Sequence, residues 1–309
     1  MNIKTFSHKS VLLRECIDGL NIKPDGIYID ATVGGAGHSC EIAKQLKGGK
    51  LFAFDKDPDA VEVAKDKLAG YSAKVINENF KEMEFELKNR GIFSVDGVLI
   101  DLGVSSYQLD NEKRGFSYLH EGALDMRMSK QGKTAADIVN TYTQKELMDI
   151  LKTYGEERFA YKIALNIVKK RTQKPIETTI ELADIIKSSI PAKFKRDKNP
   201  CKRSFQAIRI AVNCELDDLE SGLTAAFNML NSGGRLVVIS FHSLEDRIVK
   251  HRYLSFAKGC ICPVGAPICI CGNKPKARLI NKKPIEPSEE EKQCNPRCKS
   301  AKLRILEKL

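Results

Sequence analysis

Short apolar runs alternate with helix-like segments between residues 27 and 103, and this alternation constrains the fold more than any other feature. The strand-like runs are IYIDAT, LFAFD, KVINEN and GVLIDLG, with helical patterns at residues 39–46, 58–68 and 80–88 between them. Such a βαβ series predicts an α/β domain with a mostly parallel sheet and helices on both of its faces. The helix starts agree, because Asp57 can cap a helix whose first position is Pro58.

A folded insert is expected between the fourth strand and the next clear one, RLVVISF at residues 235–241. More than a hundred residues separate them, whereas a structureless loop in a compact domain rarely exceeds about 15 residues. The insert is expected to be helical, since TQKE at 143–146 and TTIE at 178–181 are capping boxes that precede apolar residues at helical spacing. We therefore predict a helical subdomain at residues 107–199, inserted into a sheet domain made of residues 1–106 and 200–309.

The first strand runs into a glycine-rich turn, IYIDATVGGAGHS at residues 27–39. Such a turn lets a ligand approach the backbone, and the N-terminus of the following helix favours negative charge. A dinucleotide site would need G-x-G-x-x-G, but Cys40 stands where the third glycine belongs, whereas S-adenosylmethionine (SAM) sites tolerate a looser turn. The pattern favours SAM, and a purely structural corner is the remaining alternative.

Acidic residues end the second and fourth strands, at the sheet edge where open α/β folds bind ligands. Asp55 can hold ribose hydroxyls there, and its alternative role as a helix cap suits Asp57 better. Asp101, in DLGVSS, is expected beside both cofactor and substrate, with an ordinary turn-capping aspartate as the alternative.

Two histidines lie at predicted helix starts near the same edge. His38 follows the glycine turn, and His242 precedes SLED, where Ser243 is the expected N-cap. His242 and Glu245 are therefore only secondary candidates for the site.

The chain is basic, with 51 lysines and arginines against 40 acids and a net charge of +11, which favours a polyanionic partner. The densest basic stretch is KFKRDKNPCKR at residues 193–203, with Phe194 inside it and Phe205 just beyond. Cations that meet phosphates and an aromatic ring that stacks on an unpaired base suit RNA binding. A solvated lysine-rich loop is the alternative. The basic residues expected to contact RNA are Lys195, Arg196, Lys198, Lys202 and Arg203.

Most of the ten cysteines are expected to be reduced, because the N-terminus lacks the pattern of a secretory signal, and only the C-terminal cluster needs separate treatment. No apolar run of about 18 residues occurs, so we expect a cytoplasmic protein without membrane association. Four cysteines form two C-x-C pairs, Cys260 with Cys262 and Cys269 with Cys271. Four thiolates can bind zinc, but structural sites usually use C-x₂₋₄-C, so plain free thiols are the alternative.

Six longer strings occur in order along the chain: DLGVSSYQLD, RGFSY, LDMRMS, LKTYGEERFA, FQAIRIAVNCEL and ISFHSLEDRIVK. Together they resemble the bacterial 16S ribosomal RNA cytosine-N4 methyltransferase family of the MraW type, from about residue 6 to residue 306. The resemblance implies a class I SAM-dependent methyltransferase fold, Rossmann-like with an inserted helical subdomain. It also implies methyl transfer to the N4 amine of a cytosine at the decoding centre of the small ribosomal subunit.

The resemblance further implies cofactor contacts at matching positions. These are Gly35, Ala36, Gly37, His38, Asp55, Phe80, Asp101 and Gln108. Phe80 would lie near the adenine, and we add the hypothesis that Asp101 is also the catalytic residue. Ala36 stands where many members have glycine, and Tyr107 where many have proline.

Two other classes of protein share part of these features. A nicotinamide oxidoreductase would share the sheet and Asp55. A non-catalytic RNA-binding or ribosome-assembly factor would share the basic segment, but it would not need the glycine turn and the strand-ending acids together.

Overall fold

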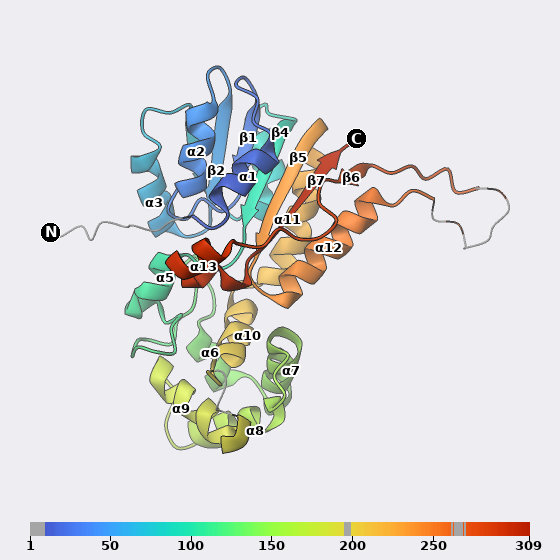
Figure 1. Cartoon of the computed structure of the whole chain (residues 1–309). Helices are drawn as coiled ribbons and strands as arrows, with labels where there is room; N and C mark the ends of the chain where they lie inside the picture. The colour runs from blue at the N-terminus through green and yellow to red at the C-terminus, as the bar shows by residue number, and fades with distance from the viewer. Residues whose placement is uncertain (1–9, 195–198, 261, 263–267, 269) are drawn as a thin grey trace. The chain divides into compact units, whose positions relative to one another are not determined.

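The computed structural model describes residues 10–194, 199–260, 262, 268 and 270–309, and it divides into two compact units (Figure 1). The first unit combines Met1–Gly103 with Leu216–Leu309, and the second is Val104–Glu215. Among the described residues, no helix is long and apolar enough to cross a membrane.

The first unit is built on a seven-stranded sheet of order β3-β2-β1-β4-β5-β7-β6. Strands β1 to β5 are parallel to one another, while β7 is antiparallel to both β5 and β6. The strands are β1 (Ile27–Asp30), β2 (Lys50–Asp55), β3 (Ala73–Asn77), β4 (Val95–Asp101), β5 (Leu230–Ser240), β6 (Ala277–Leu279) and β7 (Lys302–Lys308). The mostly parallel sheet predicted from the βαβ alternation is confirmed.

Helices cover both faces of this sheet, because neighbouring strand residues point to opposite sides. Tyr28 belongs to the same buried cluster as Leu20 of α1 and Ile42 of α2, whereas Ile29 packs with Leu219 of α11 and Val249 of α12. The helices are α1 (Leu13–Leu20), α2 (Gly37–Gln45), α3 (Pro58–Lys67), η1 (Phe80–Glu82), α4 (Met83–Lys88), α11 (Glu215–Met229), α12 (Ser243–Ala257), α13 (Glu289–Cys294) and η4 (Pro296–Ser300).

Two predicted helix starts have different outcomes. Asp57 accepts a hydrogen bond from the Asp59 N–H at 3.0 Å with Pro58 at the first helical position, as predicted for α3. The predicted N-cap Ser243 is wrong, since His242 caps α12 in a capping box with Glu245. The i to i+3 spacing of that box is satisfied from His242, where the Glu245 carboxylate accepts the backbone N–H at 3.2 Å.

The second unit is helical and has its own buried core. Its elements are α5 (Ser106–Asp110), η2 (Glu112–Arg114), α6 (Ala135–Thr141), α7 (Gln144–Gly155), α8 (Ala160–Arg171), α9 (Thr179–Ser189), η3 (Ala192–Phe194) and α10 (Lys202–Asn213). Capping boxes at Thr143 and Thr178 begin α7 and α9, as the sequence predicted.

The predicted boundary of the insert at residue 199 falls too early. Phe205 and Ile208 of α10 are buried in the core of the second unit, which extends to Glu215. The approach of α10 to α7 is close, because a Cβ on Gly155 would lie 2.8 Å from the Arg203 carbonyl oxygen. Helix α10 therefore belongs to the helical unit, and the sheet unit resumes at Leu216 instead of residue 200.

Candidate functional site

Three neighbouring strands of the first unit end in aspartate. Asp30 ends β1, Asp55 ends β2 and Asp101 ends β4. These strands are parallel and adjacent, so their carboxyl ends lie at one edge of the sheet. In open α/β folds this edge is where ligands bind.

The glycine turn between β1 and α2 is tied to Asp55. Gly34 donates its N–H to Asp55 Oδ2 at 2.8 Å, and Asp57 donates its N–H to Oδ1 at 2.9 Å. Because Asp57 caps α3, the alternative role of Asp55 as a helix cap is removed. Burial raises the pKa of Asp55 to about 6, although both backbone hydrogen bonds act to lower it.

Within the turn, the small residues have different reasons to be small. Ala36 has a positive φ of 61° and precedes α2 without a side-chain cap. A Cβ on Gly37 would lie 1.9 Å from Ser10 Oγ, so a larger residue there would require the Ser10 hydroxyl to move. A Cβ on Gly35 would meet nothing within 4 Å, so the backbone at Gly35 is open to an approaching ligand.

Asp30 is a site residue that the sequence analysis missed. Its side chain is only 1% exposed and accepts hydrogen bonds from Ser39 Oγ at 2.6 Å and from the Thr32 N–H at 3.2 Å. Burial raises the pKa of Asp30 to about 6 against these two hydrogen bonds. The available signal was the shared position of the three aspartates, each at the end of an apolar strand.

Asp101 is the most perturbed of the three acids. Its N–H donates to Thr32 Oγ1 at 2.7 Å, its side chain is 25% exposed, and its Oδ1 is buried with no hydrogen-bond partner in the described chain. Burial raises the pKa of Asp101 well above its usual range, and the negative charges of Asp30 and Glu245 raise it further.

His38 is the nearest basic side chain to Asp101, with Nδ1 3.6 Å from Oδ2. Its Nε2 lies 3.1 Å from the Val11 carbonyl oxygen, which can only accept a hydrogen bond. Both ring nitrogens thus face acceptors, and Nδ1 can donate to the Asp101 carboxylate only when it carries a proton.

The two secondary candidates at the fifth strand have a structural role. Glu245 accepts backbone hydrogen bonds from Phe241 at 2.8 Å and His242 at 3.2 Å, which fixes the start of α12. Glu245 still acts on the site electrostatically, since its charge raises the pKa of Asp101.

Phe80 follows the carboxyl end of β3 and is 9% exposed. A Cβ on Gly222 of α11 would lie 2.2 Å from its ring, so the ring packs directly on the helix backbone. The segment is anchored from both sides, because Asn79 donates to Asp218 at 2.6 Å and Lys81 pairs with the same carboxylate at 3.0 Å.

Gln108, predicted as a cofactor contact, lies in the second unit. It closes a capping box with Ser105 at the start of α5, with the Ser105 N–H donating to Gln108 Oε1 at 3.0 Å. This contact orders the segment that follows β4 in the chain.

The basic segment of the second unit is only partly described. Lys195, Arg196 and Lys198 lie outside the described residues. Lys202 is exposed, and Arg203 donates to the Glu156 carbonyl oxygen at 3.3 Å.

The two aromatic rings predicted to lie near these cations differ in exposure. Phe205 is buried and packs edge-on against Tyr118, so it cannot stack on a base. Phe194 is 41% exposed, with the Arg158 guanidinium 5.0 Å and the Lys193 ammonium 5.1 Å from its ring centre.

The strand order, with an antiparallel β7 beside β5, and the acids at the edge of β1, β2 and β4 define a class I methyltransferase fold. The model of the MraW methylase family matches residues 5–309, and the chain belongs to this family.

Individual relatives are similar in sequence to this chain over almost its whole length. The chain is 52% identical over 307 residues to "Ribosomal RNA small subunit methyltransferase H" of Clostridium botulinum (strain Kyoto / Type A2), covering 98% of this chain and 99% of the relative. The protein of the same name in Clostridioides difficile (strain 630) is 52% identical over 309 residues, with the same coverage. A solved rRNA methylase from Streptococcus thermophilus aligns over 97% of this chain and 98% of its own, with a TM-score of 0.44 and 11% identity, which is too weak for further conclusions.

Proposed function

We propose that this protein transfers the methyl group of SAM to the N4 amine of a decoding-centre cytosine in 16S ribosomal RNA of the small subunit. Membership of the MraW methylase family and the names of the two relatives support a ribosomal RNA substrate. Membership of a methylase family also argues against a nicotinamide oxidoreductase and against a non-catalytic RNA-binding factor. A ribosomal substrate implies a cytoplasmic enzyme.

The observation that carries the cofactor assignment is the charge of the sheet edge. Of the described lysines and arginines, none forms an ion pair with Asp30, Asp55 or Asp101. Buried or partly buried acids without a lysine or arginine counter-charge suit a ligand that brings positive charge and hydroxyl donors. SAM would supply a sulfonium cation, an ammonium group, ribose hydroxyls and the electrophilic methyl group.

Each candidate residue has a proposed part in holding this cofactor. The open backbone at Gly35 and the turn through Ala36, Gly37 and His38 would receive the methionine portion. Asp55 would accept the ribose hydroxyls while its backbone hydrogen bonds keep it oriented. Phe80 would bound the adenine, and Gln108 is proposed as a further cofactor contact.

Asp101 is the proposed catalytic residue. The exocyclic amine of cytosine is a poor nucleophile because its lone pair is delocalised into the ring. A carboxylate that accepts a hydrogen bond from the amine N–H increases the electron density on nitrogen, and it holds the amine in line with the methyl group. The Asp101 side chain is 25% exposed although its Oδ1 is buried, so the exposed part of the carboxylate is the acceptor proposed for this contact.

The helical unit is proposed to hold RNA. A base paired within a helix cannot reach the partly buried Asp101 side chain, so the cytosine must be unpaired or flipped out. Phe194 with Arg158 and Lys193 provides an exposed ring flanked by cations, which suits stacking of an unpaired base beside phosphate contacts. Lys202 and the undescribed cations of the same segment would add phosphate contacts.

Methyl transfer from labelled SAM to small subunits that lack the modification tests this function. We expect N4-methylcytidine in the nucleosides from wild type and from Asp66→Asn, an exposed aspartate of α3. Asp101→Ala should lose at least about 100-fold in rate, the range for general acid–base or oxyanion contacts. Transfer to another base or atom by wild type would refute the assignment, and full activity of Asp101→Ala would refute the catalytic role alone.

A further inference from the structure

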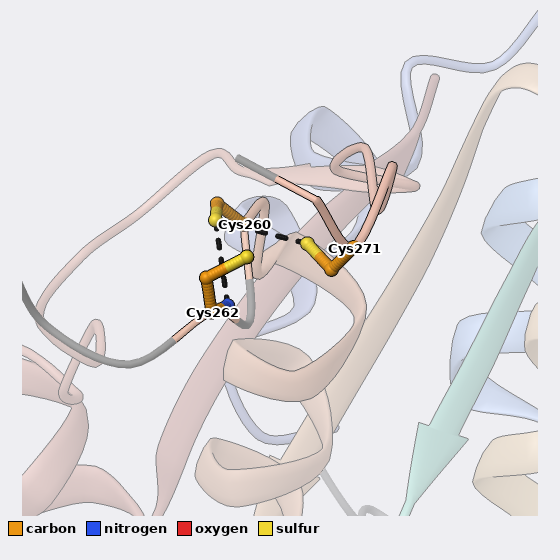
Figure 2. Close-up of side chains that lie close together, drawn as sticks. All are labelled: Cys260, Cys262 and Cys271. Atoms are coloured by element: carbon orange, nitrogen blue, oxygen red, sulfur yellow. Dashed lines mark hydrogen bonds between the residues drawn. The ribbon is translucent and has the colours of Figure 1, made fainter. Parts of the chain in front are cut away.

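Three cysteines converge in the segment between α12 and β6, far from the sheet-edge acids in sequence. Their Sγ atoms all lie within 4.8 Å of one another, and none is in a disulfide. Figure 2 shows the three side chains lying close together, with Cys260 joined by dashed lines to the Cys271 sulfur and to the backbone of Cys262. We propose that Cys260, Cys262 and Cys271 bind one zinc ion, in a site separate from methyl transfer.

The spacing of the sulfur atoms suits a metal ion. Tetrahedral zinc with Zn–S bonds of about 2.3 Å holds its sulfur ligands about 3.8 Å apart. The Sγ atoms of Cys271 and Cys260 are 3.7 Å apart, close to this value and well beyond the roughly 2.05 Å of a disulfide. Zinc therefore fits with little movement, whereas a disulfide would require the two cysteines to close on each other.

The cramped C-x-C spacing is accommodated by the local backbone. The Cys262 N–H donates to Cys260 Sγ at 3.4 Å, a turn that brings both side chains toward Cys271. A backbone hydrogen bond to a sulfur ligand is a contact that commonly supports a metal-bound thiolate.

The base of the loop is held closed without a metal. Lys276 donates its N–H to the Phe256 carbonyl oxygen at 2.9 Å, and Asn273 Nδ2 donates to the Lys258 carbonyl oxygen at 3.0 Å. These contacts hold the two ends of the loop together, so little further ordering of the chain is needed when the ion binds.

The charge balance is also favourable. Each thiol releases its proton on binding, so three thiolates and Zn²⁺ carry a net charge of −1. Lys258, Lys274 and Lys276 line a hollow at the loop base, and their positive charges offset this excess. Water can occupy the fourth position, and Cys269, the other cysteine of the C-x-C pairs, lies outside the described residues.

Titration of the reduced, metal-free, full-length protein with Co²⁺ tests the site. We expect one Co²⁺ per chain, a thiolate-to-cobalt charge-transfer band with the visible bands of tetrahedral cobalt, and loss of these bands when Zn²⁺ is added. Protons should be released as the ion binds. Absence of the charge-transfer band in the reduced protein would overturn the proposal. If the band is absent and the oxidised protein contains a Cys260–Cys271 disulfide, the cysteines form a disulfide pair instead of a zinc site.

Single variants identify the ligands. Cys260→Ser, Cys262→Ser and Cys271→Ser should each weaken Zn²⁺ binding by more than about 100-fold, beyond the 10- to 100-fold typical of groups outside the ligand set. Cys294→Ser, at an exposed cysteine outside the cluster, should bind Zn²⁺ like wild type. Retention of the cobalt spectrum in the triple serine variant would overturn the assignment, and circular dichroism of each variant checks that the fold is intact.

Discussion

Replacing Asp30 by asparagine should strengthen the fold at neutral pH, although the change removes a buried charge from the candidate site. Asp30 is 1% exposed, and burial raises its pKa from 3.8 to about 6. The neutral amide of asparagine has nearly the same shape and avoids the desolvation of a carboxylate. The gain must depend on pH, which separates it from any loss of packing or of the Ser39 hydrogen bond.

The sign and size follow from linkage. A carboxyl whose pKa is higher in the folded protein than in the unfolded chain weakens the fold as pH rises between the two values. For Asp30 the penalty is near zero below about pH 3, about 1 kcal/mol near pH 4.5 and about 3 kcal/mol near pH 7.5. The asparagine amide does not titrate, so Asp30→Asn should gain about 2 kcal/mol relative to wild type between about pH 4.5 and pH 7.5.

Urea denaturation at these two pH values measures the difference, with hydrogen exchange of β1 and β2 peptides identifying the transition of the sheet unit. A constant effect of the lost Ser39 contact cancels between the two pH values. Removing the Asp30 charge also lowers the pKa of Asp55 and Asp101, which changes the result in the same direction. Asp66→Asn should shift by less than about 0.5 kcal/mol. An Asp30→Asn difference that is equal at both pH values, or larger at the lower one, would refute the reasoning.

Three further predictions concern the cofactor and RNA. Burial and neighbouring acids raise the pKa of Asp101, so its carboxylate gains charge as pH rises. The affinity for SAM should therefore rise with pH more steeply than the affinity for S-adenosylhomocysteine, which has no sulfonium. Equal slopes of the two affinities against pH in calorimetry would contradict this. Gly222→Ala puts a methyl group 2.2 Å from the Phe80 ring. We therefore expect a loss of about 1–3 kcal/mol in unfolding free energy, measured by denaturation, together with weaker SAM binding in calorimetry. Unchanged values in both measurements would show that the ring is free to move. Phe194→Ala should weaken RNA binding by about 1–3 kcal/mol in filter assays and lose less stability than Phe205→Ala, because the Phe194 ring is 41% exposed and packs only partly, on Phe159. The buried Phe205→Ala should lose about 3–5 kcal/mol of stability, and the reverse order would exclude Phe194 as a stacking ring.

Features encoded over a few residues could be predicted from the sequence. The four N-terminal strands and the capping boxes of α7 and α9 depend on local periodicity and on side chains three residues apart. The extent of the helical unit could not be predicted in this way. The pattern of α10 shows that Phe205 and Ile208 form a buried face, but it does not say which unit buries them. That depends on the close approach to Gly155, a contact between segments far apart in the chain.

The candidate site also contains residues that could be predicted from the sequence and residues that could not. Asp55 and Asp101 were predictable because each follows an apolar run and precedes a turn or loop. Asp30 has the same setting, yet its role depends on burial behind the turn and on the Ser39 hydroxyl of α2. Residue preferences for the N-cap position also could not predict that His242 instead of Ser243 caps α12. The start of this helix is fixed by the backbone N–H groups that donate to the Glu245 carboxylate.

The strand-ending acids link stability to cofactor preference at this edge. Burying Asp30, Asp55 and Asp101 without a lysine or arginine partner in the described chain weakens the unliganded fold, as the raised pKa values of all three show. Such a penalty is tolerated where a ligand supplies the missing positive charge. On the proposed function, the acidic edge favours a cationic methyl donor over the same molecule after transfer, when its sulfur is neutral. The charge arrangement that destabilises the empty site therefore also favours release of the product.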